Sequence, residues 1–178
     1  MAEFLGLDIV WDRIPSDLEG EIAARILPLE RLIEINESIL ELPQGFEQST
    51  VAHELGHWEF HIDQKATGKF EEQLKQGIEI EMQPFLCRAV NGDLQKIEWQ
   101  AQRFASYLLM PHHILELMEA ERNITNWQHL YAMAKDLGVT ISNLKNRLIH
   151  LQWIELYQGD KNIYLGKAAP DRNKTARL

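Results

Sequence analysis

Two histidines and a glutamate lie close together at residues 53–57, in the order His-Glu-Leu-Gly-His. On a helix, residues four apart lie one turn apart on the same face, so both imidazoles can reach one metal ion. Glu54 is rotated by about 100° from His53, so it can contact an activated water without being a ligand. This HExxH pattern predicts a zinc site in which His53 and His57 bind the metal and Glu54 acts as general base.

A catalytic zinc site needs a third protein ligand, and the candidates are His61, Asp63, Glu81 and Glu98. The extended metalloprotease pattern places a glycine three residues after the second histidine, so that the chain can return a ligand three residues later. Phe60 occupies that position, which argues against Asp63. His61 lies one turn further along the same helix, where three ligands in a row approach tetrahedral geometry poorly. We therefore expect His61 to be a neighbour of the site or a partially exposed helix histidine.

Glu98 begins a second apolar-periodic segment and lies on one stripe with Ala101 and Ala105, at spacings of three and four. Small alanines let two helices approach closely. A buried carboxylate at the end of such a stripe needs a partner, and a metal ion is a suitable one. The alternative is an exposed helix glutamate with no part in the site. Glu81 has no comparable context.

Two longer motifs contain these residues: Ala-His-Glu-Leu-Gly-His at 52–57, and Glu-x-x-Ala-x-x-Phe-Ala-x-x-Leu-Leu-Met-Pro at 98–111. Together they resemble the paired motifs of the ImmA/IrrE family of metallopeptidases, and the resemblance covers residues 20–112. Gln102 is a departure, because the family often has asparagine there, but it lies off the ligand stripe. The Arg-Leu-x-x-Leu sequence at 147–151 also looks like the end of the C-terminal helix in many members.

The resemblance implies a zinc-dependent endopeptidase with one Zn²⁺ per chain, bound by His53, His57 and Glu98, and with Glu54 as the catalytic residue. It also implies that the substrate is an intracellular protein, often a helix-turn-helix repressor, and that cleavage serves transcription regulation and stress response. A structural zinc site in an inactive scaffold is a rival hypothesis. The intact Glu54 and the coordination position left open by three ligands argue against it.

The residue patterns around this site predict an α+β fold, with a mainly helical metallopeptidase core and a small antiparallel sheet at the N-terminus. Residues 21–27 and 31–36 carry β-branched residues in alternation on either side of a turn, which predicts two strands. Helical periodicity predicts three helices, at residues 43–62, 94–110 and 114–122. Residues 63–92 are less regular and are punctuated by glycine and proline.

The C-terminal part predicts helix, tight turn, helix and hairpin, which is the outline of a winged helix-turn-helix. The predicted elements are helices at 126–137 and 140–152 and a hairpin at 153–165. We therefore expect a metallopeptidase core at 1–123, a winged-helix-like subdomain packed on it at 124–166, and a flexible tail at 167–178.

Charge is unevenly distributed along the chain, whose net charge is −9. Residues 124–178 contain eight basic and four acidic residues, a net charge of +4, so the remainder carries −13. A DNA-binding surface usually has a stronger basic face than this. A DNA-binding or protein-binding regulator with a structural zinc is therefore the disfavoured alternative. We expect the C-terminal segment to serve in packing or substrate docking.

Three features bear on where the protein works. No apolar run approaches the length that crosses a bilayer, and no basic cluster precedes an apolar stretch at the N-terminus. The single cysteine, Cys87, cannot form an internal disulfide, which suits a reducing compartment. We expect a cytoplasmic protein that has a protein substrate as its partner and no association with membranes.

Overall fold

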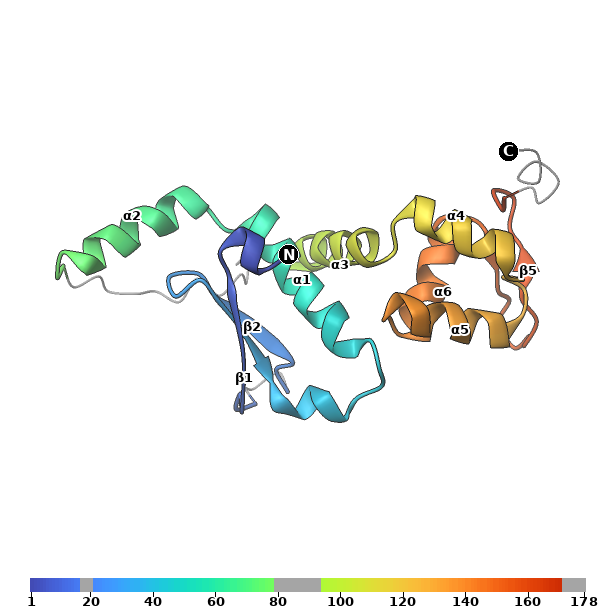
Figure 1. Cartoon of the computed structure of the whole chain (residues 1–178), viewed down its shortest axis with the longest axis horizontal. Helices are drawn as coiled ribbons and strands as arrows, with labels where there is room; N and C mark the ends of the chain where they lie inside the picture. The colour runs from blue at the N-terminus through green and yellow to red at the C-terminus, as the bar shows by residue number, and fades with distance from the viewer. Residues whose placement is uncertain (17–20, 79–93, 171–178) are drawn as a thin grey trace. The chain divides into compact units, whose positions relative to one another are not determined.

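The computed structural model describes residues 1–16, 21–78 and 94–170 (Figure 1). These residues contain six α-helices and a three-stranded sheet, so the predicted α+β class is confirmed. Two compact units are present: Met1–Leu42 with Ser49–Ala105, and Pro43–Gln48 with Ser106–Leu178. The domain boundaries expected from the sequence stay predictions, and part of the expected tail lies outside the described residues. No helix in the described ranges is both long and apolar enough to cross a bilayer.

The sheet of the first unit has the strand order β1-β3-β2, from strands Asp8–Asp12 (β1), Ala24–Leu27 (β2) and Leu32–Asn36 (β3). The predicted hairpin is present, because β2 and β3 pair antiparallel. The expectation of an antiparallel sheet was wrong for β1, which pairs parallel to β3. No tight turn joins β1 to β3, and the long intervening segment, which includes β2, gives the chain room for the crossover that parallel pairing needs. Ile33 and Ile35 on the central strand are fully buried.

Helix α1 (Phe46–His61) carries the HExxH residues. It begins three residues after Pro43, where the sequence predicted its start, because Gly45 has a positive φ of 91° that is incompatible with a helix. Trp58 is buried on its apolar side, and the guanidinium of Arg31, at the β2–β3 turn, lies 5.7 Å from its ring centroid. This contact ties the helix to the sheet. Two 3₁₀ helices, Glu3–Leu5 and Glu37–Glu41, flank the strands.

Helix α3 (Leu94–Leu109) packs closely against α1. Ala101 and Ala105 are fully buried, as the alanine stripe predicted. The contact is so close that a Cβ added at Gly56 would lie 2.9 Å from Ala101 Cα. Glycine on one helix and alanine on the other therefore set the spacing of the two helices that carry the candidate site.

We expect Gly56→Ala to lower the free energy of unfolding by about 1–3 kcal/mol, since overpacking a well-packed contact costs that much. Gly68→Ala is the matched control, because Gly68 is also helical but nothing lies within 4 Å of the Cβ it would gain. There the better helix propensity of alanine should raise stability by up to about 1 kcal/mol. Urea unfolding measures both variants, and a Gly56→Ala protein as stable as wild type would contradict the close helix contact.

Helix α2 (Gln64–Lys75) was not predicted, because an interior glycine such as Gly68 usually indicates a break in a helix. The signal for its start is Asp63, whose carboxylate accepts hydrogen bonds of 3.0 Å from the backbone N–H groups of Lys65 and Ala66. This is an ordinary N-cap. Glu71 on α2 forms an ion pair of 3.6 Å with Arg31, so the helix is also linked to the β2–β3 turn.

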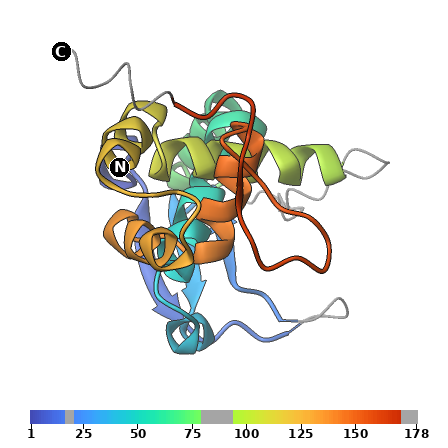
Figure 2. The same ribbon diagram turned by 90° about the vertical axis from the view of Figure 1, so that its right-hand side faces the viewer.

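The second unit follows the predicted order of elements (Figure 2). Its elements are α4 (His112–Glu121), α5 (Trp127–Leu137), α6 (Ile141–His150), β4 (Ile154–Glu155) and β5 (Tyr164–Leu165). Asn126 and Thr140 cap the starts of α5 and α6 through their side chains, and Gly138 ends α5 in the left-handed conformation. β4 and β5 form a two-residue antiparallel pair. Whether this segment works as a winged helix stays a prediction.

Candidate metal centre

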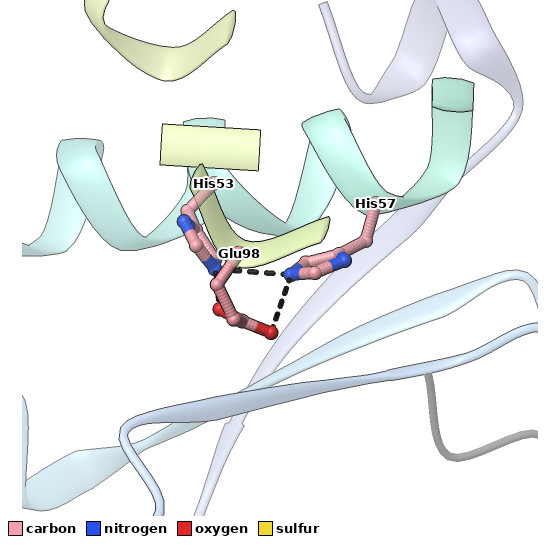
Figure 3. A group of neighbouring side chains, drawn as sticks. All are labelled: His53, His57 and Glu98. Carbon is pink, nitrogen blue, oxygen red and sulfur yellow. Dashed lines mark hydrogen bonds and ion pairs between the residues drawn. The ribbon is translucent and has the colours of Figure 1, made fainter. Parts of the chain in front are cut away.

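The first unit brings together three side chains that can bind a metal: His53 and His57 from α1, and Glu98 from α3 (Figure 3). His53 Nε2 lies 3.0 Å from His57 Nε2 and 3.0 Å from Glu98 Oε2. His57 Nε2 lies 3.4 Å from Glu98 Oε1. One helix turn places the two imidazoles on one face, and the close α1–α3 contact places the carboxylate opposite them.

These separations fit one small cation. Ligand atoms bound at about 2.0–2.1 Å around a tetrahedral ion lie about 3.3 Å apart. The Nε2 atoms of His53 and His57 and the Glu98 carboxylate form a donor triangle. The two nitrogens lie 3.0 Å apart, and each lies 3.0 or 3.4 Å from a different oxygen of the carboxylate, which is close to that value. Two imidazole nitrogens and a carboxylate are also the donor types of catalytic zinc sites. The geometry and the chemistry of the three residues therefore both suit a divalent metal with one position left open.

The protonation state of His57 also suits metal binding. The side chain is buried, and this burial, followed by the neighbouring charge of His53, lowers the pKa of His57 to about 4. The imidazole is therefore neutral at pH 7, which is the form that binds metals. Glu98 is more open, with 52% of its side chain exposed, so the donor triangle is reachable from solvent on the carboxylate side.

The carboxyl group of Glu54 is an unusually weak acid. Burial, and then the negative charge of Glu98, raise its pKa to about 7. A carboxylate with a pKa near neutrality can both accept and donate a proton under physiological conditions. The same residue is the one that HExxH spacing singled out as general base.

The other candidate ligands have different surroundings. Asp63 caps α2 with its carboxylate, and Glu81 lies outside the described residues. His61, expected as either a neighbour of the site or a partially exposed histidine, lies beside the donor triangle, with Nδ1 3.1 Å from His57 Nδ1. Its Nε2 lies 3.0 Å from Oε1 of Gln100, a residue on α3 that the sequence analysis did not single out. The only sequence signal for this contact is that His61 lies one turn beyond His57 on the same face.

Comparison with protein families gives an independent result. The family model described as the IrrE N-terminal-like domain, Peptidase_M78, matches residues 21–148, which is more than two thirds of the chain. No curated protein matches the sequence. The matched region includes both helices of the candidate metal centre and extends into the second unit. The chain therefore belongs to the ImmA/IrrE family of metallopeptidases.

Proposed function

We propose that this protein is a zinc-dependent endopeptidase in which His53, His57 and Glu98 hold one zinc ion and Glu54 is the catalytic residue. The observation that carries the proposal is the donor triangle, in which the two histidine nitrogens and the Glu98 carboxylate lie close enough together to bind a single small cation. The donor types favour zinc over magnesium or calcium, which prefer oxygen ligands. Membership of a metallopeptidase family supports peptide-bond hydrolysis as the reaction and a protein as the substrate.

The proposed chemistry divides between the metal and Glu54. When bound, zinc supplies Lewis acidity, which polarises the scissile carbonyl and lowers the pKa of water. Glu54 accepts the proton of the attacking water while the new carbon–oxygen bond forms. It then delivers a proton to the leaving amine while the carbon–nitrogen bond breaks. Burial raises the pKa of Glu54, which favours its holding the proton between the two transfers.

A narrower part of the proposal concerns the substrate. The resemblance to the ImmA/IrrE family supports a helix-turn-helix repressor in the cytoplasm as the protein that is cut. Cleavage of such a repressor would change transcription, for example in a stress response. The exposed side of the donor triangle, at Glu98, is the side from which an extended segment of the substrate can enter.

DNA binding by the C-terminal segment is the alternative, and its charges argue against it. Arg147, the arginine of α6, is buried, donates from Nε to the Met110 carbonyl at 3.3 Å and stacks on Tyr107. It is therefore not available to a phosphate. The remaining basic residues of the described part of this segment, from residue 124 onward, are Lys135, Lys145, Lys161 and Lys167, against the acids Asp136, Glu155 and Asp160. A nearly neutral surface favours packing or protein docking over DNA binding.

A trapping experiment tests the proposed function. The Glu54→Gln protein, loaded with zinc, should retain its substrate because the site is intact but the proton acceptor is missing. Proteins captured from a lysate of the source organism are identified by mass spectrometry and then incubated with wild type. At least one should be cut at a defined bond by the zinc-loaded wild type, and by neither the chelator-treated enzyme nor the variant. If wild type cuts none of the captured proteins, the proposal of a peptidase is wrong.

A further inference from the structure

A chain of hydrogen-bonding groups leads away from the proposed ligands. His57 Nδ1, on the opposite side of the ring from the donor triangle, lies 3.1 Å from His61 Nδ1. His61 Nε2 lies in turn 3.0 Å from Gln100 Oε1. His57 and His61 belong to α1 and Gln100 belongs to α3. This series of hydrogen-bonding groups therefore connects the helix that supplies two proposed ligands to the helix that supplies the third.

The number of protons on each imidazole decides which group donates and which accepts in this series of hydrogen bonds. A neutral imidazole carries one proton, on one of its two nitrogens. For Nε2 of His57 to offer a lone pair to a metal, its proton must be on Nδ1, and His61 Nδ1 must then accept it. The proton of His61 is consequently on Nε2, where the carbonyl oxygen of Gln100 accepts it. In this arrangement each donor meets an acceptor.

The opposite direction of proton donation would leave His57 Nε2 without a lone pair for the metal. If the Gln100 amide nitrogen faced His61, it would donate to His61 Nε2, and the His61 proton would move to Nδ1. His57 would then accept at Nδ1 and carry its own proton on Nε2, the atom 3.0 Å from His53 Nε2. A protonated Nε2 cannot bind a metal. The orientation of the Gln100 amide therefore determines whether the proton of His57 is on Nδ1 or on Nε2.

We propose that His61 and Gln100 are positioning residues that keep the His57 proton on Nδ1 and leave the Nε2 lone pair for the metal. This inference rests on the proposed zinc site. His57 is only 5% exposed, so water cannot readily replace the acceptor that His61 provides. Gln100 is needed as well, because an imidazole, unlike a carboxylate, accepts at Nδ1 only while its proton is elsewhere. Removing such an outer partner typically costs about 10- to 100-fold in metal affinity.

Zinc affinity, measured by competition with a chromophoric chelator, tests the inference. His61→Phe and Gln100→Leu should each bind zinc about 10- to 100-fold more weakly than wild type. His61→Asn should restore most of the affinity, because its amide oxygen lies as many bonds from the backbone as Nδ1 does. Gln102→Leu is the matched control on the exposed side of α3 and should bind like wild type. Wild-type affinity in both His61→Phe and Gln100→Leu would overturn the inference.

A second readout needs no variant. In zinc-loaded wild type labelled with ¹⁵N in its histidines, long-range ¹H–¹⁵N spectra should report neutral His61 with its proton on Nε2 and His57 with its proton on Nδ1. A His61 proton on Nδ1, or on both nitrogens, would overturn the inference even if the variants were too unstable to measure. His57→Ala separates this result from the larger proposal. If His57→Ala binds zinc like wild type, the zinc site itself is wrong. If His57→Ala loses zinc but His61→Phe and Gln100→Leu both bind it like wild type, only the positioning role is rejected.

Discussion

Replacing Glu54 with glutamine is expected to leave the zinc in place and to slow peptide-bond cleavage by about 10²- to 10⁴-fold. Glutamine has the size of glutamate but cannot accept the proton of the attacking water. Glu54 is not one of the three donors that approach one another closely, so the metal should not depend on it. Cleavage is measured with the captured substrate, and zinc is measured by elemental analysis of the same preparation.

The matched control for this variant is Glu59→Gln. Glu59 lies on the same helix but is exposed, so the same chemical change there should alter neither cleavage nor zinc content. Two results would contradict the role assigned to Glu54. Loss of zinc in Glu54→Gln would make the residue a ligand, and a rate within a few-fold of wild type would exclude it as the proton acceptor.

Replacing Glu98 with alanine is expected to weaken zinc binding by more than about 100-fold. The loss of a direct ligand should exceed the 10- to 100-fold that outer-shell partners cost. Glu98 supplies oxygens 3.0 Å from His53 Nε2 and 3.4 Å from His57 Nε2, so its removal leaves two imidazoles to hold the ion. Competition with a chelator of known affinity gives the size of the effect.

Asp63→Ala is the informative comparison for Glu98→Ala. Because the Asp63 carboxylate caps α2, its removal should lower the free energy of unfolding by about 1 kcal/mol and leave zinc affinity nearly unchanged. The two variants therefore differ in which property they change. If Asp63→Ala lost the metal while Glu98→Ala kept it, the third ligand would have been assigned to the wrong residue.

The local parts of this site could be predicted from the sequence, because helical spacing decides them. His53 and His57 share a face because they are four residues apart, whatever the rest of the fold does. Glu98 was predicted as a ligand from its alanine stripe and the family resemblance, and the structure brings its carboxylate beside the two histidines. Ala101 is buried against Gly56 as that stripe requires. Gln100 was missed because it meets His61 across 39 residues of sequence. No local pattern specifies which polar residue of α3 faces that histidine.

In the fold, too, local features could be predicted from the sequence and tertiary features could not. Helices α5 and α6 begin at side-chain caps, and α5 ends at the left-handed Gly138, so these bounds were predictable. Helix α2 was missed because Gly68 resembles a breaker, although in the structure nothing packs against it and the helix continues through it. The parallel pairing of β1 with β3 depends on tertiary contacts between segments distant in the sequence. Alternation identifies strands but does not give their neighbours or directions.

A crystal grown with zinc gives the most direct test of the central claim, that His53, His57 and Glu98 together hold a zinc ion. Anomalous difference density is recorded on either side of the zinc absorption edge. We expect one peak per chain, about 2.0–2.2 Å from Nε2 of both histidines and from a carboxylate oxygen of Glu98. Absence of a peak at this position, or a peak ligated by Asp63 or Glu81 in place of Glu98, would contradict the account.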